Sequence, residues 1–282
     1  VWIEFMIFRH YQTVGGKDAE SQWQIHYREA GVGIPIILLH PSPTSSVFME
    51  PLIELFARHG RAIAWDTPGY GQSDKLPCDT EGLDPYVQAL NEFITRLGLD
   101  RPVIYGSATG AQLAIEYGKA YPKNTRGLIL DNAAWFYDSE RDAIMESYFP
   151  DISPQEDGSH LQLVWKMATQ VYRYFPWYDR SSPVKNSVKI PLSVVQQTAL
   201  DYLTAGTEYD RAYRAAFLNE RPEQLRGLSI PTRLMRWQDS MLKDYTDRLD
   251  GADLPANIKM CPAGAGKDNR LSTLEQVLAE LL

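Results

Sequence analysis

Short apolar runs alternate with segments of helical periodicity over the first 130 residues, and this alternation limits the folds open to the chain. Residues 34–40 (IPIILLH) form a continuous apolar run, which is typical of a strand buried on both faces. Residues 45–59 follow with apolar side chains at helical spacing. Further strands are expected at 24–29, 61–66, 102–105 and 127–130, and further helices at 85–99 and 111–121. From residue 61 to residue 130, these strands and helices alternate along the chain. The pattern predicts an α/β fold with a mainly parallel sheet and helices on both of its faces.

Residues 132–227 interrupt this rhythm. They show helical spacing at 161–173, 191–205 and 209–218, with few strand signals. Strand patterns return at 232–237 and 258–261, and a last helix is expected at 272–282. We therefore expect a core made of residues 1–131 and 228–282 that carries a helical cap of residues 132–227.

Charge and composition narrow the function classes. The formal net charge of −8 argues against nucleic-acid binding, which requires a basic face. No run approaches the roughly 18 apolar residues of a membrane-spanning helix. The apolar run at 1–8 is expected to be a first strand rather than a signal peptide, since it carries Glu4 and lacks a basic leader. Two cysteines, Cys78 and Cys261, make no disulfide framework, and we expect a cytoplasmic protein with a small-molecule partner.

Four short motifs then follow one another along the chain. They are LLHPSPTSS at 38–46, WDTPGYGQSD at 65–74, YGSATG at 105–110 and PAGAGK at 262–267. In this order they resemble the α/β-hydrolase superfamily: the segment after the third strand, the turn after the fourth, the nucleophile elbow Gly-x-Nu-x-Gly and the loop of the catalytic histidine. The chain most resembles the capped group of epoxide hydrolases, haloalkane dehalogenases and carbon–carbon bond hydrolases. The resemblance implies an α/β-hydrolase fold with a helical cap.

The residue at the tip of the elbow is Ala108, where the resemblance implies a Ser, Asp or Cys nucleophile. Gly106 and Gly110 leave room for the sharp turn from strand to helix. Ser107 is adjacent, but its side chain is expected to point away from the pocket. Two explanations are open: Ala108 is an engineered substitution, or the protein naturally lacks this nucleophile.

The position that the resemblance implies for the catalytic histidine is occupied by Lys267. Lys267 would act as a general base only if burial lowered its pKa toward neutrality; otherwise it is a surface cation or pairs with Asp268. Asp239, after the strand expected at 232–237, matches the position of the acid. Asp131 matches the alternative acid position of some capped relatives. A Ser–His–acid relay therefore cannot be assembled in the usual way.

The oxyanion donors that the resemblance implies are intact. They are the backbone N–H groups of Ser42 and Thr109, since Pro41 lacks an N–H but Ser42 keeps its own. His40 lies at a strand end beneath this loop, where a structural hydrogen-bonding role is expected. His160, in the cap just before an expected helix, is either a base, a substrate contact or a surface histidine.

Aromatic side chains concentrate between residues 135 and 178. Most of them are expected to pack the cap against the core, and the rest, with Trp135 and Trp165 among them, to line an apolar pocket. We therefore expect a small hydrophobic or aromatic substrate. The histidines are dispersed, so no metal site is expected, and no nucleotide-binding glycine motif follows a strand, so no cofactor is expected.

Three functions stay open. The first is hydrolysis of an ester, epoxide or related bond, with residue 108 as the nucleophile of a parent protein and His160 or Lys267 as the base. The second is a lyase or cofactor-free oxygenase reaction, which needs no covalent nucleophile and uses the donors of Ser42 and Thr109. The third is binding of a small molecule without turnover. A monomer or a homodimer is expected in each case.

Overall fold

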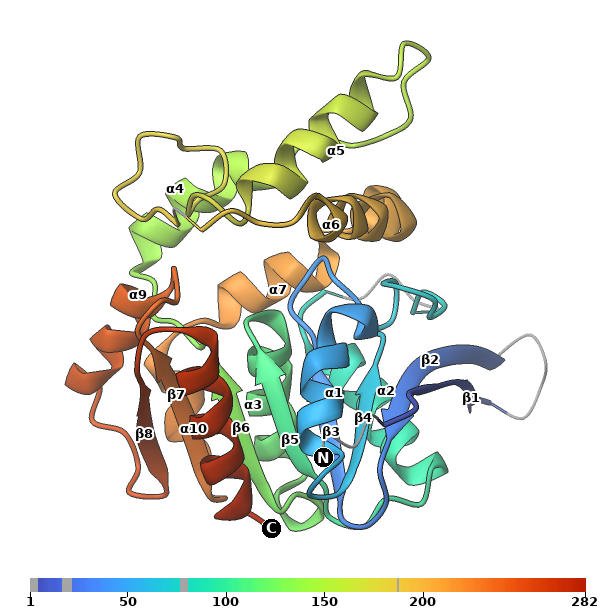
Figure 1. Ribbon diagram of the computed structural model, residues 1–282, viewed down its shortest axis with the longest axis vertical. Helices are drawn as coiled ribbons and strands as arrows, with labels where there is room; N and C mark the ends of the chain where they lie inside the picture. The colour runs from blue at the N-terminus through green and yellow to red at the C-terminus, as the bar shows by residue number, and fades with distance from the viewer. Residues whose placement is uncertain (1–4, 17–21, 77–80, 187) are drawn as a thin grey trace.

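The computed structural model describes residues 5–16, 22–76, 81–186 and 188–282. The strands in these ranges are β1 (Phe8–Gly15), β2 (Gln22–Ala30), β3 (Pro35–Leu39), β4 (Arg61–Trp65), β5 (Val103–Ser107), β6 (Gly127–Asp131), β7 (Thr232–Trp237) and β8 (Ile258–Ala263). These eight strands form one sheet in the order β1-β2-β4-β3-β5-β6-β7-β8 (Figure 1). β1 is antiparallel to β2 and β2 is antiparallel to β4, whereas the other neighbours are parallel.

Helices connect the parallel strands, as the alternating sequence pattern predicts. The α-helices are α1 (Glu50–Phe56), α2 (Asp84–Arg96), α3 (Thr109–Ala120), α4 (Asp138–Tyr148), α5 (Ser159–Gln170), α6 (Leu192–Ala205), α7 (Arg211–Asn219), α8 (Pro222–Arg226), α9 (Lys243–Asp247) and α10 (Lys267–Ala279). Short 3-10 helices are η2 (Ser46–Met49), η3 (Pro122–Asn124), η4 (Gly206–Glu208) and η5 (Arg248–Gly251).

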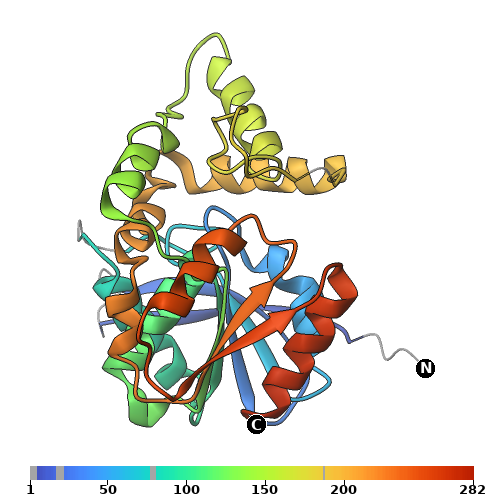
Figure 2. The ribbon, with the colours of Figure 1, turned by 90° about the vertical axis from the view of Figure 1, so that its left-hand side faces the viewer.

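Alternate side chains of the central strands pack against different helices, because successive residues of a strand point to opposite faces. Ile36 and Leu38 of β3 lie in one buried cluster with residues of α1 and α10. Ile37 and Leu39 lie in a second cluster with residues of α2 and α3. Figure 2 shows these helices on the two sides of the sheet. The predicted α/β fold, a mainly parallel sheet covered on both faces, is confirmed.

Helices α4, α5 and α6 lie beyond the carboxyl ends of the parallel strands (Figures 1 and 2). α7 returns the chain toward the sheet and packs against both α3 and α4. The described residues of the 132–227 segment contain helices and one isolated bridge, between Tyr174 and Lys185, but no strand. Division of the chain into a cap of 132–227 and a core of 1–131 and 228–282 stays a prediction.

The aromatic side chains of this segment pack mainly on one another. Six rings have centroids within 6.5 Å of the Tyr148 ring: Phe149, Phe175, Trp177, Tyr178, Tyr213 and Phe217. Trp165, in contrast, is 44% exposed, because α5 buries Met167 and Ala168 on its other face. The expected place of Trp165 in the lining of a pocket stays a prediction.

Several element boundaries differ from the sequence-based expectation. The strand expected at 1–8 is corrected: residues 5–7 are irregular and β1 begins at Phe8, while residues 1–4 lie outside the described ranges. The helix expected at 45–59 divides into η2 and α1, with Pro51 in the first turn of α1, where proline is tolerated. The last helix begins at Lys267 rather than at residue 272.

Cys261 carries a free thiol, and Cys78 lies outside the described residues. Among the helices that the structure describes, none is both long and apolar enough to cross a lipid bilayer.

Candidate active site

The turn from β5 into α3 has the strained geometry of an elbow. Ala108 at its tip has φ 48° and ψ −111°, a conformation that residues with a Cβ rarely adopt. A Cβ on Gly106 would lie 2.2 Å from the carbonyl oxygen of Gly110, and one on Gly110 would lie 2.2 Å from that of Leu39. Both glycines are therefore required, and their close contacts hold the turn in place.

The tip of this elbow carries a methyl group where the motif calls for an attacking atom. Ala108 is partly exposed, whereas the neighbouring Ser107 is buried. Ser107 Oγ accepts a hydrogen bond from the side-chain amide of Asn132 at 3.2 Å. The hydroxyl of Ser107 is thus engaged with the residue that follows β6, and it does not replace the missing nucleophile.

The two implied oxyanion donors lie at one edge of the sheet. Leu39 of β3 pairs with Gly106 of β5 in parallel register. Ser42 follows Leu39 by three residues and Thr109 follows Gly106 by three, so both donors lie beyond the same end of the two paired strands. Thr109 is the first residue of α3, and its N–H has no acceptor within the helix. Thr109 Oγ1 is buried and has no hydrogen-bond partner among the described residues. A buried donor without a partner costs free energy unless a ligand satisfies it.

His40 supports the loop that carries Ser42. The backbone N–H of Thr67 donates to His40 Nε2 at 2.9 Å, so this nitrogen carries the lone pair. His40 Nδ1 then donates to the carbonyl oxygen of Pro41 at 3.1 Å. Burial lowers the pKa of His40, so the ring is neutral. Both ring nitrogens are occupied by the backbone, which gives His40 a structural role.

The acid position and the histidine loop do meet. Asp239 Oδ2 accepts a hydrogen bond from the backbone N–H of Gly266 at 2.7 Å. Lys267 follows as the first residue of α10, and it is exposed, as is Asp239. Within the described residues Lys267 makes no ion pair, either with Asp239 or with Asp268. Lys267 therefore stands at the surface rather than in a buried, apolar environment.

Asp131, the alternative acid, is hydrogen-bonded to Tyr105 and Arg270. Its buried carboxylate accepts hydrogen bonds from Tyr105 Oη at 2.8 Å and from Arg270 Nε at 3.1 Å, with a further contact from Arg270 Nη2. Burial works against the charge of Arg270, but the carboxylate of Asp131 and the hydroxyl of Tyr105 together raise the pKa of the guanidinium. Asp131 therefore joins β6 to α10 rather than orienting a base.

Two other candidates belong to the segment that follows β6. α5 begins at the outermost loop of the helices above the sheet (Figures 1 and 2), and His160 is its second residue. His160 Nδ1 accepts the backbone N–H of Gln155 at 3.0 Å. A role for His160 as a base or a substrate contact stays a prediction. Trp135 is half-buried against Tyr137, with ring centroids 5.6 Å apart, in the segment between β6 and α4.

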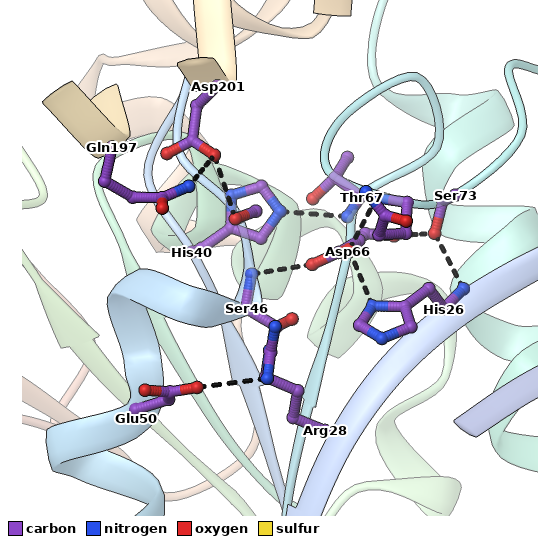
Figure 3. Close-up of polar contacts among 12 residues, drawn as sticks. His26, Arg28, His40, Ser46, Glu50, Asp66, Thr67, Ser73, Gln197 and Asp201 are labelled. Carbon is purple, nitrogen blue, oxygen red and sulfur yellow. Dashed lines mark hydrogen bonds and ion pairs between the residues drawn. The ribbon is translucent and has the colours of Figure 1, made fainter. Parts of the chain in front are cut away.

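Sequence reasoning missed a buried polar network at the other end of the same edge (Figure 3). Asp66 Oδ2 lies 2.8 Å from His26 Nδ1, and its Oδ1 accepts the backbone N–H of Ser46 at 2.6 Å. Burial alone would raise the pKa of Asp66, but these hydrogen bonds outweigh it and lower the pKa. Asp201 of α6 accepts a hydrogen bond from Ser45 Oγ at 3.1 Å, which links α6 to the loop before η2.

A cavity of about 300 Å³ adjoins this network. It lies between the hairpin of β1 and β2, the start of η2 at 45–47, the turn at 71–72, and α6, and none of its lining residues belongs to the elbow. The alternation of Arg9 with Tyr11 and of His26 with Arg28 is the sequence signal that marks its hairpin wall. No group of three or more His, Cys, Asp or Glu side chains in the described ranges is arranged to hold a metal ion.

Comparison with known proteins identifies the chain's relatives. Residues 34–151 match the family model described as alpha/beta hydrolase fold. Haloalkane dehalogenase 2 of Mycobacterium bovis is 30% identical over 127 residues, which cover 43% of this chain and 44% of that protein. The 2-hydroxy-6-oxononadienedioate/2-hydroxy-6-oxononatrienedioate hydrolase 2 of Pseudomonas putida is 32% identical over 119 residues, 40% of this chain and 42% of that protein. These alignments span less than half the length of the curated relatives.

Solved structures share the fold over nearly the whole chain. A thermophilic esterase from Thermogutta terrifontis superposes with a TM-score of 0.67 at 16% identity, covering 96% of this chain and 97% of that one. The haloalkane dehalogenase DatA from Agrobacterium tumefaciens superposes with a TM-score of 0.64 at 21% identity, covering 97% and 96%. The likeness to these structures establishes the architecture.

Proposed function

Because this chain is an α/β-hydrolase-fold protein, we propose that it binds a small carbonyl compound at the elbow and forms no covalent bond to residue 108. The carbonyl oxygen is received by the backbone N–H groups of Ser42 and Thr109. The observation that carries the proposal is the elbow itself: the strained turn is preserved around the methyl group of Ala108. The recognition site is thus retained where the attacking atom is missing.

Two further features support binding over the usual relay. The hydroxyl of Thr109 is buried without a partner among the described residues, which leaves a second donor for a ligand oxygen. Three of the described candidate bases are engaged by other groups: His40 by the backbone, Asp131 by Arg270, and His160 by the backbone N–H of Gln155. Lys267 is exposed and makes no ion pair within the described residues. Without a base, a water molecule or a serine at the elbow is poorly activated.

We propose that the part of this ligand outside its carbonyl group is apolar. An apolar group would match the aromatic residues of the 135–178 segment. Trp135 is half-buried and stands in the connection between β6 and α4, close in sequence to the carboxyl edge of the sheet. A small hydrophobic or aromatic carbonyl compound therefore suits the site better than a highly charged one.

Hydrolysis of an ester, epoxide or related bond is the second candidate function, in a parent protein with a nucleophile at position 108. A specific observation favours it. Alanine at φ 48° is strained, and its methyl group supplies no chemical function that glycine would lack. A nucleophile in this conformation, in contrast, would face the oxyanion donors. The curated relatives in the comparison are named as hydrolases and dehalogenases.

Binding and turnover of 4-methylumbelliferyl butyrate distinguish the two candidates. Tryptophan fluorescence reports binding, and fluorescence of the released alcohol reports hydrolysis. We expect saturable binding by the unaltered chain with no hydrolysis above the buffer rate. Absence of saturable binding would overturn the proposal, and so would turnover by the unaltered chain. Ala108→Ser and Ala108→Asp test the second candidate: hydrolysis gained by either variant supports it, whereas none by either of them or by Ala108→Ser/Lys267→His contradicts it.

A further inference from the structure

We propose that the cavity between the β1–β2 hairpin and α6 is a second ligand site, which takes a small organic anion. The charged group of the ligand, a carboxylate or a phosphate, is expected to bind Arg9 and Arg28 (Figure 3 shows Arg28 beside the polar network). The polar remainder would reach Gln197 and Asp201 of α6. The cavity volume of about 300 Å³ is at the lower end of small-molecule pockets.

The register of the hairpin places both arginines on one face. Arg9 of β1 is the direct cross-strand partner of Arg28 of β2, and Tyr11 is the partner of His26. Residues two apart on a strand share a face, so these four side chains project from the same side of the hairpin. All four line the cavity. One wall of the cavity is therefore built by the hairpin alone and carries two guanidinium groups.

The charge on this wall is only partly balanced. Like charges directly opposite each other on paired strands repel, and a bound anion would remove the repulsion. Arg28 Nη1 pairs with Glu50 Oε1 at 3.0 Å, but Arg28 Nε is buried and has no hydrogen-bond partner among the described residues. Arg9 makes no ion pair within those residues and is exposed. A buried guanidinium donor without a partner, next to a second guanidinium, is suited to a carboxylate or phosphate oxygen.

The carboxylates of the cavity are already held by other groups. Asp66 accepts hydrogen bonds from the backbone N–H groups of Ser46 and Gln72, at 2.6 and 2.8 Å, besides its contact with His26. Asp201 accepts from Ser45 Oγ and from the side-chain amide of Gln197, each at 3.1 Å. Asp201 lies on α6 rather than on the hairpin, so the anionic group and this carboxylate occupy opposite walls.

Calorimetric titration of the full chain with succinate and, separately, with inorganic phosphate tests the site at constant ionic strength. The two probes distinguish a carboxylate ligand from a phosphate ligand. We expect at least one of them to bind the unaltered protein at a single site, and Arg9→Gln and Arg28→Gln to weaken that binding at least about tenfold. Asp201→Asn should strengthen it, because one negative charge leaves the cavity.

Lys259→Gln is the matched control, since it removes one exposed positive charge from β8 at the opposite edge of the sheet. This variant should bind the probe as the unaltered protein does. Arg9 is exposed and makes no ion pair among the described residues, so Arg9→Gln tests the site even if Arg28→Gln fails to fold. Failure of both probes to bind at 10 mM would overturn the proposal. Undiminished binding by Arg9→Gln, or an equal loss with Lys259→Gln, would do the same.

Discussion

Asp239 Oδ2 accepts a hydrogen bond from the backbone N–H of Gly266 at 2.7 Å. The contact joins the loop after β7 to the loop after β8, directly before Lys267. The carboxylate is therefore in place to orient a side chain at position 267, although the residue there is a lysine that it does not pair with. This hydrogen bond joins the loops that carry the expected acid and histidine positions.

The combined variant Ala108→Ser/Lys267→His should gain hydrolysis of p-nitrophenyl acetate. A serine at the elbow needs a general base, and a histidine next to Gly266 would stand close to the Asp239 carboxylate. We expect the double variant to be about 100-fold faster than Ala108→Ser alone. Adding Asp239→Asn should remove most of the gain. A double variant no faster than Ala108→Ser would show that residue 267 cannot reach the elbow.

Ala108→Gly should stabilise the protein. Glycine adopts φ 48° and ψ −111° without the strain that a Cβ causes, and this relief exceeds the extra backbone entropy of glycine in the unfolded chain. We expect the free energy of unfolding in urea to rise by about 1 kcal/mol. Ala111→Gly, inside α3 at a buried position, should lower it by about 1 kcal/mol or more. A loss of stability in Ala108→Gly would contradict the strain at the elbow.

Thr109→Val should have opposite effects on stability and binding. It replaces a buried hydroxyl that has no partner among the described residues by a methyl group of similar shape, so the unliganded protein should gain about 1 kcal/mol. Binding of 4-methylumbelliferyl butyrate should weaken about fivefold, since one donor to the ligand is lost. Thr125→Val is the control: its buried hydroxyl donates to the Tyr121 carbonyl at 3.0 Å, so its loss should destabilise. A lower free energy of unfolding in Thr109→Val than in the unaltered protein would indicate that the Thr109 hydroxyl has a hydrogen-bond partner.

Asp201 should make stability fall as the pH rises through the range 4 to 6. Burial raises the pKa of Asp201 to about 6, with a further contribution from the charge of Asp66, while hydrogen bonds from Gln197 and Ser45 oppose the rise. An unfolded aspartate has a pKa of about 3.9, so the folded state binds the extra proton in this window and loses stability when the proton leaves.

Asp201→Asn removes this titration, since the amide stays neutral and its oxygen can still accept both hydrogen bonds. Urea unfolding should show the variant more stable than the unaltered protein by roughly 1–2 kcal/mol at pH 7.5 and equally stable near pH 4. Asp100→Asn, at an exposed position, should show no such pH dependence. A difference that does not change with pH would exclude the raised pKa of Asp201 as its cause.

Some parts of the site could be predicted because their signals are local. The glycines at 106 and 110 flank a strand-to-helix turn within a few residues, and the structure shows why each is required. Other assignments depend on packing between distant segments, which the sequence pattern does not show. His160 stands just before an expected helix of the cap, and only the structure shows that its ring accepts the backbone N–H of Gln155 at the start of α5. Asp131 matches an acid position, yet its partner Arg270 comes 139 residues later.

The sequence by itself determined the alternation of strands and helices in the centre of the sheet, the elbow and the alanine at its tip, because apolar periodicity and glycine spacing act over short stretches of chain. Tertiary structure decided which ionisable groups meet. Arg9 opposes Arg28 through the register of the hairpin, and Asp201 reaches Ser45 across the interface of α6 with the core loop. Register and helix docking depend on contacts between residues far apart in sequence, so the pattern of one chain leaves these pairs undetermined.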